Sequence, residues 1–230
     1  MAEYAAVEPR FLARIPDGLG FLEAASLPRA ALTAWQAIKV KAGREVKVGM
    51  RVLVVGATGA VGRIMVQLLK VAVGKRGRVI AVGGAGGERL KEMGADVVVN
   101  YREERDWEAV VRSEGLVDVS FDCVGSEALH RCLGCVRDGG KLVTIGSPPP
   151  TWGEVREKKV AELDRGVKGV FFVVEESGTM LEDIAGLVES SGLKPSVGMV
   201  VDGLTEEGVR EGWSKGLKGG LAGSVVVKIL

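Results

Sequence analysis

The sequence predicts an α/β protein built on a doubly wound, parallel six-stranded sheet in the order 3-2-1-4-5-6. Short apolar runs rich in valine recur between residues 51 and 174, and stretches with helical spacing separate them. The first run leads directly into a glycine-rich turn and a helix. Strands that alternate with helices imply right-handed crossovers, which make the strands parallel in one sheet.

The chain before residue 51 predicts extended pieces followed by helix. Pro9 and Pro16 interrupt residues 2–16, so we expect short extended segments there. Apolar positions predict a helix over residues 21–40, which Pro28 divides into a short turn and a longer helix.

Strands and helices alternate from residue 51 onward. The predicted strands cover residues 51–56, 78–82, 97–99, 117–123, 140–146 and 169–174. The predicted helices between them cover residues 60–73, 88–93, 103–113 and 126–136. The C-terminal part predicts a helix over 180–190, a strand over 197–201, a helix over 205–217 and a strand over 223–230.

The turn after the first strand carries the strongest functional signal. Residues 56–62 read G-A-T-G-A-V-G, so Ala57, Gly59 and Gly62 occupy the three glycine positions of the fingerprint G-x-G-x-x-G. Between a strand and a helix, such a turn lets backbone N–H groups approach a pyrophosphate at the positive end of the helix. The alternative is a purely structural turn.

Composition excludes several classes of protein. The net charge of +1 gives no electrostatic reason to expect nucleic acid or an anionic membrane as a partner. No apolar run approaches the roughly 20 residues of a membrane span, and no secretory signal is visible. Three cysteines without a disulfide-like pattern fit a reducing compartment. We therefore expect a cytoplasmic protein that acts on a small molecule.

We expect no metal site. The pattern His130-x-Cys132-x-x-Cys135 resembles a ligand cluster, but His130 is the single histidine of the chain. A structural zinc site needs four such ligands and a catalytic one needs three. Both cysteines fall on the predicted helix over 126–136, where a free cysteine packs as a small apolar residue. The sequence also singles out no catalytic acid, base or nucleophile.

A series of motifs resembles one family of enzymes. The motifs are E-A-A-S-L-P at residues 23–28, L-T-A-W at 32–35, the glycine turn at 56–62, G-A-D at 94–96, N-Y-R at 100–102, F-D-C-V-G at 121–125 and G-G-K-L-V at 139–143. In this order they are similar to the cofactor domain of the medium-chain dehydrogenase/reductase superfamily. The branch they resemble is the zinc-independent quinone oxidoreductases, which are zeta-crystallin-like proteins.

The resemblance implies a Rossmann domain with remnants of a GroES-like β domain. We expect residues 1–20 to be a remnant of that catalytic domain and residues 21–175 to form the dinucleotide-binding domain. Residues 176–230 would then supply a helix and the strands that return to the catalytic domain. Family members carry most of the GroES-like domain before the point where this chain begins, and they bind substrate between the two domains.

The cofactor is expected to be NADP(H) rather than NAD(H). NAD enzymes usually place an acidic residue about 20 residues after the last fingerprint glycine, where it binds the ribose 2′-hydroxyl. Here residues 82–85 hold no carboxylate, and Arg89 lies near enough in sequence to meet a 2′-phosphate. The resemblance places Tyr101 by the adenosine phosphate. The alternative is that residues 83–87 form a flexible loop and that Arg89 is simply solvated.

Further cofactor contacts follow from position and from the resemblance. The turn itself supplies Ala57, Thr58, Gly59, Val61 and Gly62. The carboxyl ends of three later strands supply Val124, Gly125, Ile145, Gly146, Phe172 and Val173, because ligands bind outside these ends of an open sheet. The resemblance adds Thr33 near the nicotinamide amide. The alternatives are a Thr33 hydroxyl bonded to its own helical turn, and sheet packing for Val124 and Val173.

These observations predict a zinc-independent, NADPH-dependent reductase that transfers hydride to a quinone, an enone or a related carbonyl compound. The alternative is an NADP(H)-binding but catalytically incomplete fragment or partner subunit. The family also suggests a homodimer joined through sheet edges, with residues 171–174 as the edge. The competing interpretation is a buried sixth strand under the last helices.

Overall fold

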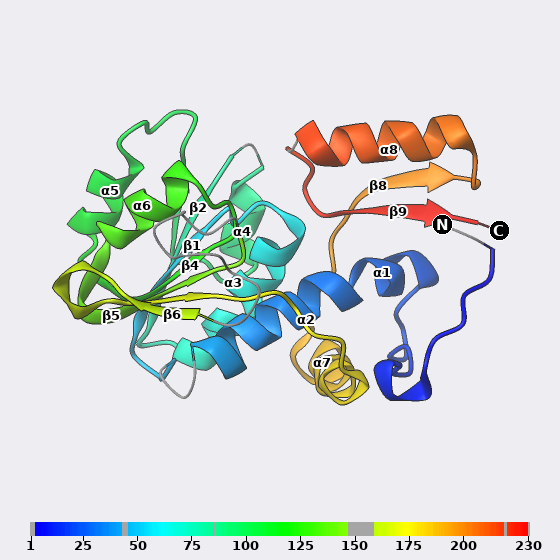
Figure 1. The fold of residues 1–230 in the computed structure, drawn as a ribbon, viewed down its shortest axis with the longest axis horizontal. Coiled ribbons are helices and arrows are strands. Elements are labelled where there is room, and N and C mark those ends of the chain that lie inside the picture. Colours follow the sequence, from blue (N-terminus) through cyan, green and yellow to red (C-terminus); the bar gives the residue numbers. More distant parts are fainter. Residues whose placement is uncertain (1–2, 43–45, 85, 147–158, 219, 230) are drawn as a thin grey trace.

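The computed structural model describes residues 3–42, 46–84, 86–146, 159–218 and 220–229. Its main feature is a seven-stranded sheet in the order β3-β2-β1-β4-β5-β7-β6 (Figure 1). The strands are β1 (Arg51–Val55), β2 (Arg78–Gly83), β3 (Val97–Asn100), β4 (Val117–Asp122), β5 (Val136–Thr144), β6 (Lys159–Glu162) and β7 (Lys168–Phe171). With β7 as the sixth parallel strand, the predicted doubly wound order is confirmed.

An unpredicted strand closes one edge of this sheet. β6 pairs antiparallel with β7, and β7 pairs parallel with β5 on its other side. The interpretation of residues 171–174 as a free sheet edge is therefore wrong, because β7 is interior and already ends at Phe171. Phe172 is buried in the core shared with Ile184, which agrees with the competing interpretation.

Helices cover both faces of the large sheet. The face of Val52 and Val54 packs against α2 (Pro28–Gln36), α3 (Ala60–Val73), α4 (Glu88–Glu92) and α7 (Gly178–Ser191). The face of Leu53 and Val55 packs against α5 (Trp107–Ser113) and α6 (Glu127–Leu133). Successive residues of a strand point to opposite faces, so the all-apolar run of β1 fills both cores.

A second, smaller layer stands apart from the large sheet (Figure 1). In it β8 (Val197–Asp202) and β9 (Ser224–Lys228) pair in parallel, and α8 (Glu206–Lys218) connects them. The Ser224 hydroxyl donates to the Ser26 carbonyl at 3.1 Å and so ties β9 to α1 (Phe21–Ser26). The described residues before α1 contain a short 3-10 helix, Pro9–Phe11, and no strand, and the residues on either side of it, Glu8 and Leu12, have an extended backbone.

Two predicted helices have different bounds in the structure. α5 begins at Trp107 instead of residue 103, because the Asp106 side chain accepts from the Ala109 N–H at 3.3 Å and caps the helix there. α6 ends at Leu133, so Cys135 is not helical: its carbonyl accepts from the Val117 N–H at 2.9 Å at the start of β4. Pro28 divides the N-terminal helix as predicted, and a π-helical turn, Ala37–Lys41, extends it.

Candidate functional site

The glycine turn after β1 forms a cradle that side chains would fill. Gly56 adopts φ +81°, a left-handed conformation that favours glycine. A Cβ atom built on Gly62 would lie 2.4 Å from the Gly56 carbonyl oxygen and 2.6 Å from the Ala57 Cα. Helix α3 can therefore approach β1 this closely only with glycine at position 62.

The N-terminus of α3 opens onto this cradle. Gly59 is the N-cap residue, and its carbonyl accepts from the Arg63 N–H at 3.0 Å. The N–H groups of Ala60, Val61 and Gly62 precede that bond, and they have no acceptor within the helix. Three backbone donors at the positive helix end suit a pyrophosphate. Ala57 adds none, because its N–H donates to the Val82 carbonyl and its side chain is fully buried.

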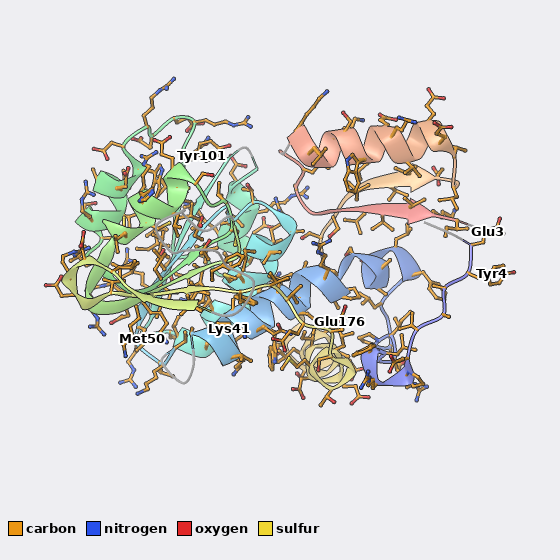
Figure 2. The ribbon with its side chains drawn as sticks, in the orientation of Figure 1. Glu3, Tyr4, Lys41, Met50, Tyr101 and Glu176 are labelled. Carbon is orange, nitrogen blue, oxygen red and sulfur yellow. The ribbon has the colours of Figure 1, made fainter. Side chains whose placement is uncertain are left out.

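The last residue of β2 and the residue after it have little room for a side chain. A Cβ built on Gly83, the last residue of β2, would lie 2.6 Å from the Thr58 Cγ2. One built on Gly84 would meet the Tyr101 ring at 3.3 Å. Tyr101 follows β3 in a turn, on the side of the molecule that holds the large sheet, whereas Glu3 lies at the opposite end (Figure 2). Thr58 and Tyr101 thus flank the place where NAD enzymes carry an acidic residue, and Arg89 is exposed on α4 nearby.

Sequence reasoning missed a buried charged residue beside this corner. Arg63 is only 2% exposed, and its Nε donates to the Thr58 carbonyl at 2.9 Å. Burial and, to a smaller extent, the neighbouring Arg89 guanidinium lower the pKa of Arg63. The sequence could have pointed to Arg63, because it is the one charged residue among the first ten residues of α3, which are mostly apolar.

A buried carboxylate shapes the turn after β4. Asp122 is 1% exposed and accepts from the N–H groups of Val124, at 2.9 Å, and Gly125, at 3.0 Å. It also accepts from the Thr144 hydroxyl at 2.7 Å. A Cβ built on Gly146 would lie 2.4 Å from the Gly125 nitrogen, so the ends of β4 and β5 touch through their backbones.

A cavity of about 380 Å³ lies at the carboxyl ends of β5 and β7. It brings together five of the expected site residues, which are Thr33, Val61, Ile145, Phe172 and Val173. Arg29 and Ser224 also line the cavity, and sequence analysis did not predict them as site residues. Its walls are largely apolar, as is typical of a pocket for a small organic molecule.

The structure also distinguishes the roles of the cavity residues. The Thr33 hydroxyl donates to the Arg29 carbonyl at 2.7 Å, so the bond to its own helical turn, given above as the alternative, is formed. The hydroxyl oxygen keeps its lone pairs and could still accept a hydrogen bond from a ligand. Val173 is 70% exposed and Val124 56% exposed, so neither packs in the sheet core. The Gln36 side chain donates to the Glu175 carbonyl at 2.7 Å and accepts from its N–H at 3.0 Å, which fixes the segment after β7.

The expected site residues thus form two groups around the α3 N-terminus. Thr58, Arg89 and Tyr101 surround the end of β2, and the cavity residues surround the ends of β5 and β7. Gly59, Val61 and Gly62 lie between them. Val124 and Gly125 form the turn after β4, and Gly146, which follows β5, lies against this turn.

The cysteine and histidine side chains do not converge. His130 is exposed, whereas Cys132 and Cys135 are fully buried. Burial raises the pKa of Cys132, and it raises that of Cys135 to about 12, so both stay as thiols. Within the described ranges, no group of three His, Cys, Asp or Glu side chains could hold a metal ion. No helix in the described part of the chain is long and apolar enough to cross a membrane.

The fold and the glycine cradle define a dinucleotide-binding protein of the Rossmann class. Comparison with known proteins then gives the family. A family model described as zinc-binding dehydrogenase matches residues 60–190. The chain belongs to this family, within the medium-chain dehydrogenase/reductase superfamily.

The relatives are named oxidoreductases. A probable zinc-binding oxidoreductase, mitochondrial, from Arthroderma benhamiae is 37% identical over 77% of this chain and 54% of that protein. The 2-methylene-furan-3-one reductase of Solanum lycopersicum is 33% identical over 86% of this chain and 44% of that protein. The chain therefore spans about half the length of the curated relatives it matches.

Two solved structures have the same fold. One is an NAD-dependent alcohol dehydrogenase, with a TM-score of 0.75 and 28% identity over 95% of this chain and 62% of that one. The other is the quinone oxidoreductase of Coxiella burnetii, with a TM-score of 0.75 and 28% identity over 93% of this chain and 62% of that one.

Proposed function

We propose that this chain binds NADP(H) and serves an NADPH-dependent reductase of quinones, enones or related carbonyl compounds. The observation that carries the cofactor choice is the closed end of β2. An NAD-type carboxylate at position 83 would clash with Thr58, so the site lacks the group that binds a 2′-hydroxyl and repels a 2′-phosphate. Arg89 adds positive charge beside it.

The residues present fit the whole cofactor. The free N–H groups of α3 would bind the pyrophosphate, and the cavity at Thr33 and Val173 would hold the nicotinamide. When bound, NADPH supplies a hydride from its nicotinamide ring to an electron-poor carbon. Val61, Ile145 and Val173 would exclude water from that ring, and Thr33 would accept a hydrogen bond from its amide.

The substrate class follows from the relatives and the apolar cavity wall. The Solanum lycopersicum relative is named for a substrate whose double bond is conjugated with a carbonyl group. The solved structure from Coxiella burnetii is named a quinone oxidoreductase. Both substrate types are electron-poor and accept hydride at carbon or oxygen.

We further propose that the reaction needs no zinc. The chain has one histidine, and Cys132 and Cys135 stay protonated and buried apart from it. Metal analysis of the purified protein should find less than one zinc per chain, and chelator treatment should not change NADPH oxidation. A stoichiometric zinc whose removal abolishes the activity would contradict this.

The second candidate function is cofactor binding without turnover. It is supported by the sequence, which offers cofactor contacts but singles out no catalytic acid, base or nucleophile. The test is NADPH oxidation, followed by absorbance, with a panel of quinones, enals and enones. Oxidation with any of them supports the reductase. Tight NADPH binding with no oxidation across the panel would favour the binding protein.

We also propose a homodimer in the cytoplasm. If edges of the large sheet join the subunits, the two edge strands in the described part of the chain are β3 and β6, and β6 is the one next to β7. The three cysteines are free thiols, which suits a reducing compartment. Light scattering tests the dimer, and cell fractionation tests the compartment, since several relatives are named mitochondrial.

A further inference from the structure

Arg63 is a buried charge without a counter-ion. Its side chain is almost entirely buried, and its Nη2 has no hydrogen-bond partner in the described part of the chain. No described carboxylate forms an ion pair with it. Burying a guanidinium is strongly unfavourable unless its charge and its N–H groups are matched. The single bond from Nε to the Thr58 carbonyl does not meet this need.

The surroundings of Arg63 make the charge still less favourable. Arg63 is the fourth residue of α3, close to the positive end of the helix, where cations are destabilising. The Arg89 guanidinium is near enough to repel it. An anion against Nη2 would offset all three costs, because it would pair with the charge and accept the unused N–H groups.

The position of the guanidinium indicates which anion this is. The pyrophosphate is expected on the backbone N–H groups of Ala60–Gly62. The Arg63 side chain instead extends between Thr58 and the loop after β2, where a Cβ built on Gly86 would lie 3.8 Å from Nη2. In a doubly wound sheet this loop faces the ribose 2′ position. We propose that Arg63 binds the ribose 2′-phosphate of NADP(H) and sets the cofactor preference, an inference that rests on the function proposed above.

The test replaces Arg63 with methionine, which keeps the unbranched apolar stem but lacks the guanidinium group, and measures binding by calorimetry. The ligands are NADPH, NADH, 2′,5′-ADP and 5′-ADP. For Arg63→Met, we expect NADPH and 2′,5′-ADP to bind at least about tenfold more weakly, with NADH and 5′-ADP unchanged. Without ligand, the variant should melt at the same or a higher temperature, because an unpaired buried charge is gone.

Arg76→Met is the matched control, because Arg76 is exposed before β2 at the opposite end of the sheet. It should change none of the four affinities. If Arg63→Met does not fold, Arg63→Gln keeps a donor for the Thr58 carbonyl without the charge and should show the same selective loss.

Three outcomes separate the possible errors. If NADPH binds Arg63→Met as tightly as the unaltered protein, the role of Arg63 is wrong while the proposed function stands. An equal loss for NADPH and NADH would make Arg63 a pyrophosphate or structural residue and would also overturn the inference. If the unaltered protein does not prefer NADPH to NADH, both the inference and the proposed cofactor fail.

Discussion

The Asp122 carboxylate accepts a 2.7 Å hydrogen bond from the Thr144 hydroxyl, and this bond joins the carboxyl ends of β4 and β5 beside the proposed cofactor site. The same carboxylate holds the Val124 and Gly125 N–H groups. One buried side chain therefore shapes a turn that the proposed site needs. Its partners come from the turn directly after β4 and from the next strand, β5.

Replacing Asp122 with asparagine should open this turn. Asparagine keeps one acceptor oxygen but turns an NH₂ group toward backbone donors. We expect a loss of about 1.5–3 kcal/mol in the free energy of unfolding, because hydrogen bonds to a charged acceptor are lost in a buried site. Urea denaturation measures it. Asp138→Asn is the control, since that side chain is 78% exposed and its ion pair should contribute little. Equal effects of the two changes would contradict this account of Asp122.

Adding one methyl group at Gly62 should disrupt the cradle. The new Cβ would meet the Gly56 and Ala57 backbone, which cannot move aside as a flexible side chain would. We expect Gly62→Ala to lower stability by about 1–3 kcal/mol and to weaken NADPH binding. Gly59→Ala is the matched control, because its Cβ would lie 3.4 Å from the nearest atom, the Gly56 carbonyl oxygen. Tolerance of both changes would mean that the close approach of α3 to β1 is not required.

An acidic residue at the end of β2 should not create an NAD site by itself. Gly83→Asp would press its Cβ against the Thr58 methyl group, so we expect loss of stability and no gain in NADH affinity. Removing that methyl group with Thr58→Ser in the same chain should restore folding and shift the preference toward NADH. Calorimetry and thermal melts measure both effects. A stable Gly83→Asp variant that prefers NADH would show that Thr58 does not close this position.

The fold could be predicted further than the site. The six parallel strands follow from valine-rich runs, because a strand buried on both faces is mostly apolar. β6 was missed because Lys159–Glu162 has no such run and owes its pairing to β7. Val136 was assigned to a helix because it continues the helical spacing of Leu129 and Leu133, but pairing with β4 places it in β5.

The site residues that sequence analysis missed depend on tertiary contacts. Arg63 stands out in the sequence as a charge in an apolar stretch of helix, but its burial and its bond to the Thr58 carbonyl appear only in the folded structure. Arg29 joins the cavity because α2 brings it one turn from Thr33, and Gln36 matters because it reaches Glu175 across the fold. The glycines were recognised because their spacing is a local property of the chain.

Stability should also depend on pH through Glu108 on α5. The Arg131 guanidinium donates from Nε to Glu108 at 2.6 Å and also from its Nη2, and these bonds lower the pKa of Glu108. A carboxyl with a lowered folded-state pKa stabilises the fold above its ordinary pKa, and that contribution disappears as the pH falls through the lowered value. The difference in unfolding free energy between the unaltered protein and Glu108→Gln should therefore be largest near neutral pH and shrink below about pH 4.

The control for Glu108 is an exposed ion pair of similar length. Glu206 lies 2.7 Å from Arg210 one turn along α8, and its side chain is 81% exposed. Glu206→Gln should change stability by less than about 0.5 kcal/mol at any pH, because solvent screens the pair. A pH-independent effect of Glu108→Gln would show that the carboxylate charge is not what stabilises α5 against α6.

The most direct test of the central claim is a calorimetric titration of the purified chain with NADPH and, separately, with NADH. The account predicts one NADPH site per chain, with NADPH bound more tightly than NADH and both lost in Gly59→Asp, whose carboxylate would face the pyrophosphate. Failure of both cofactors to bind, or binding that survives unchanged in Gly59→Asp, would contradict it.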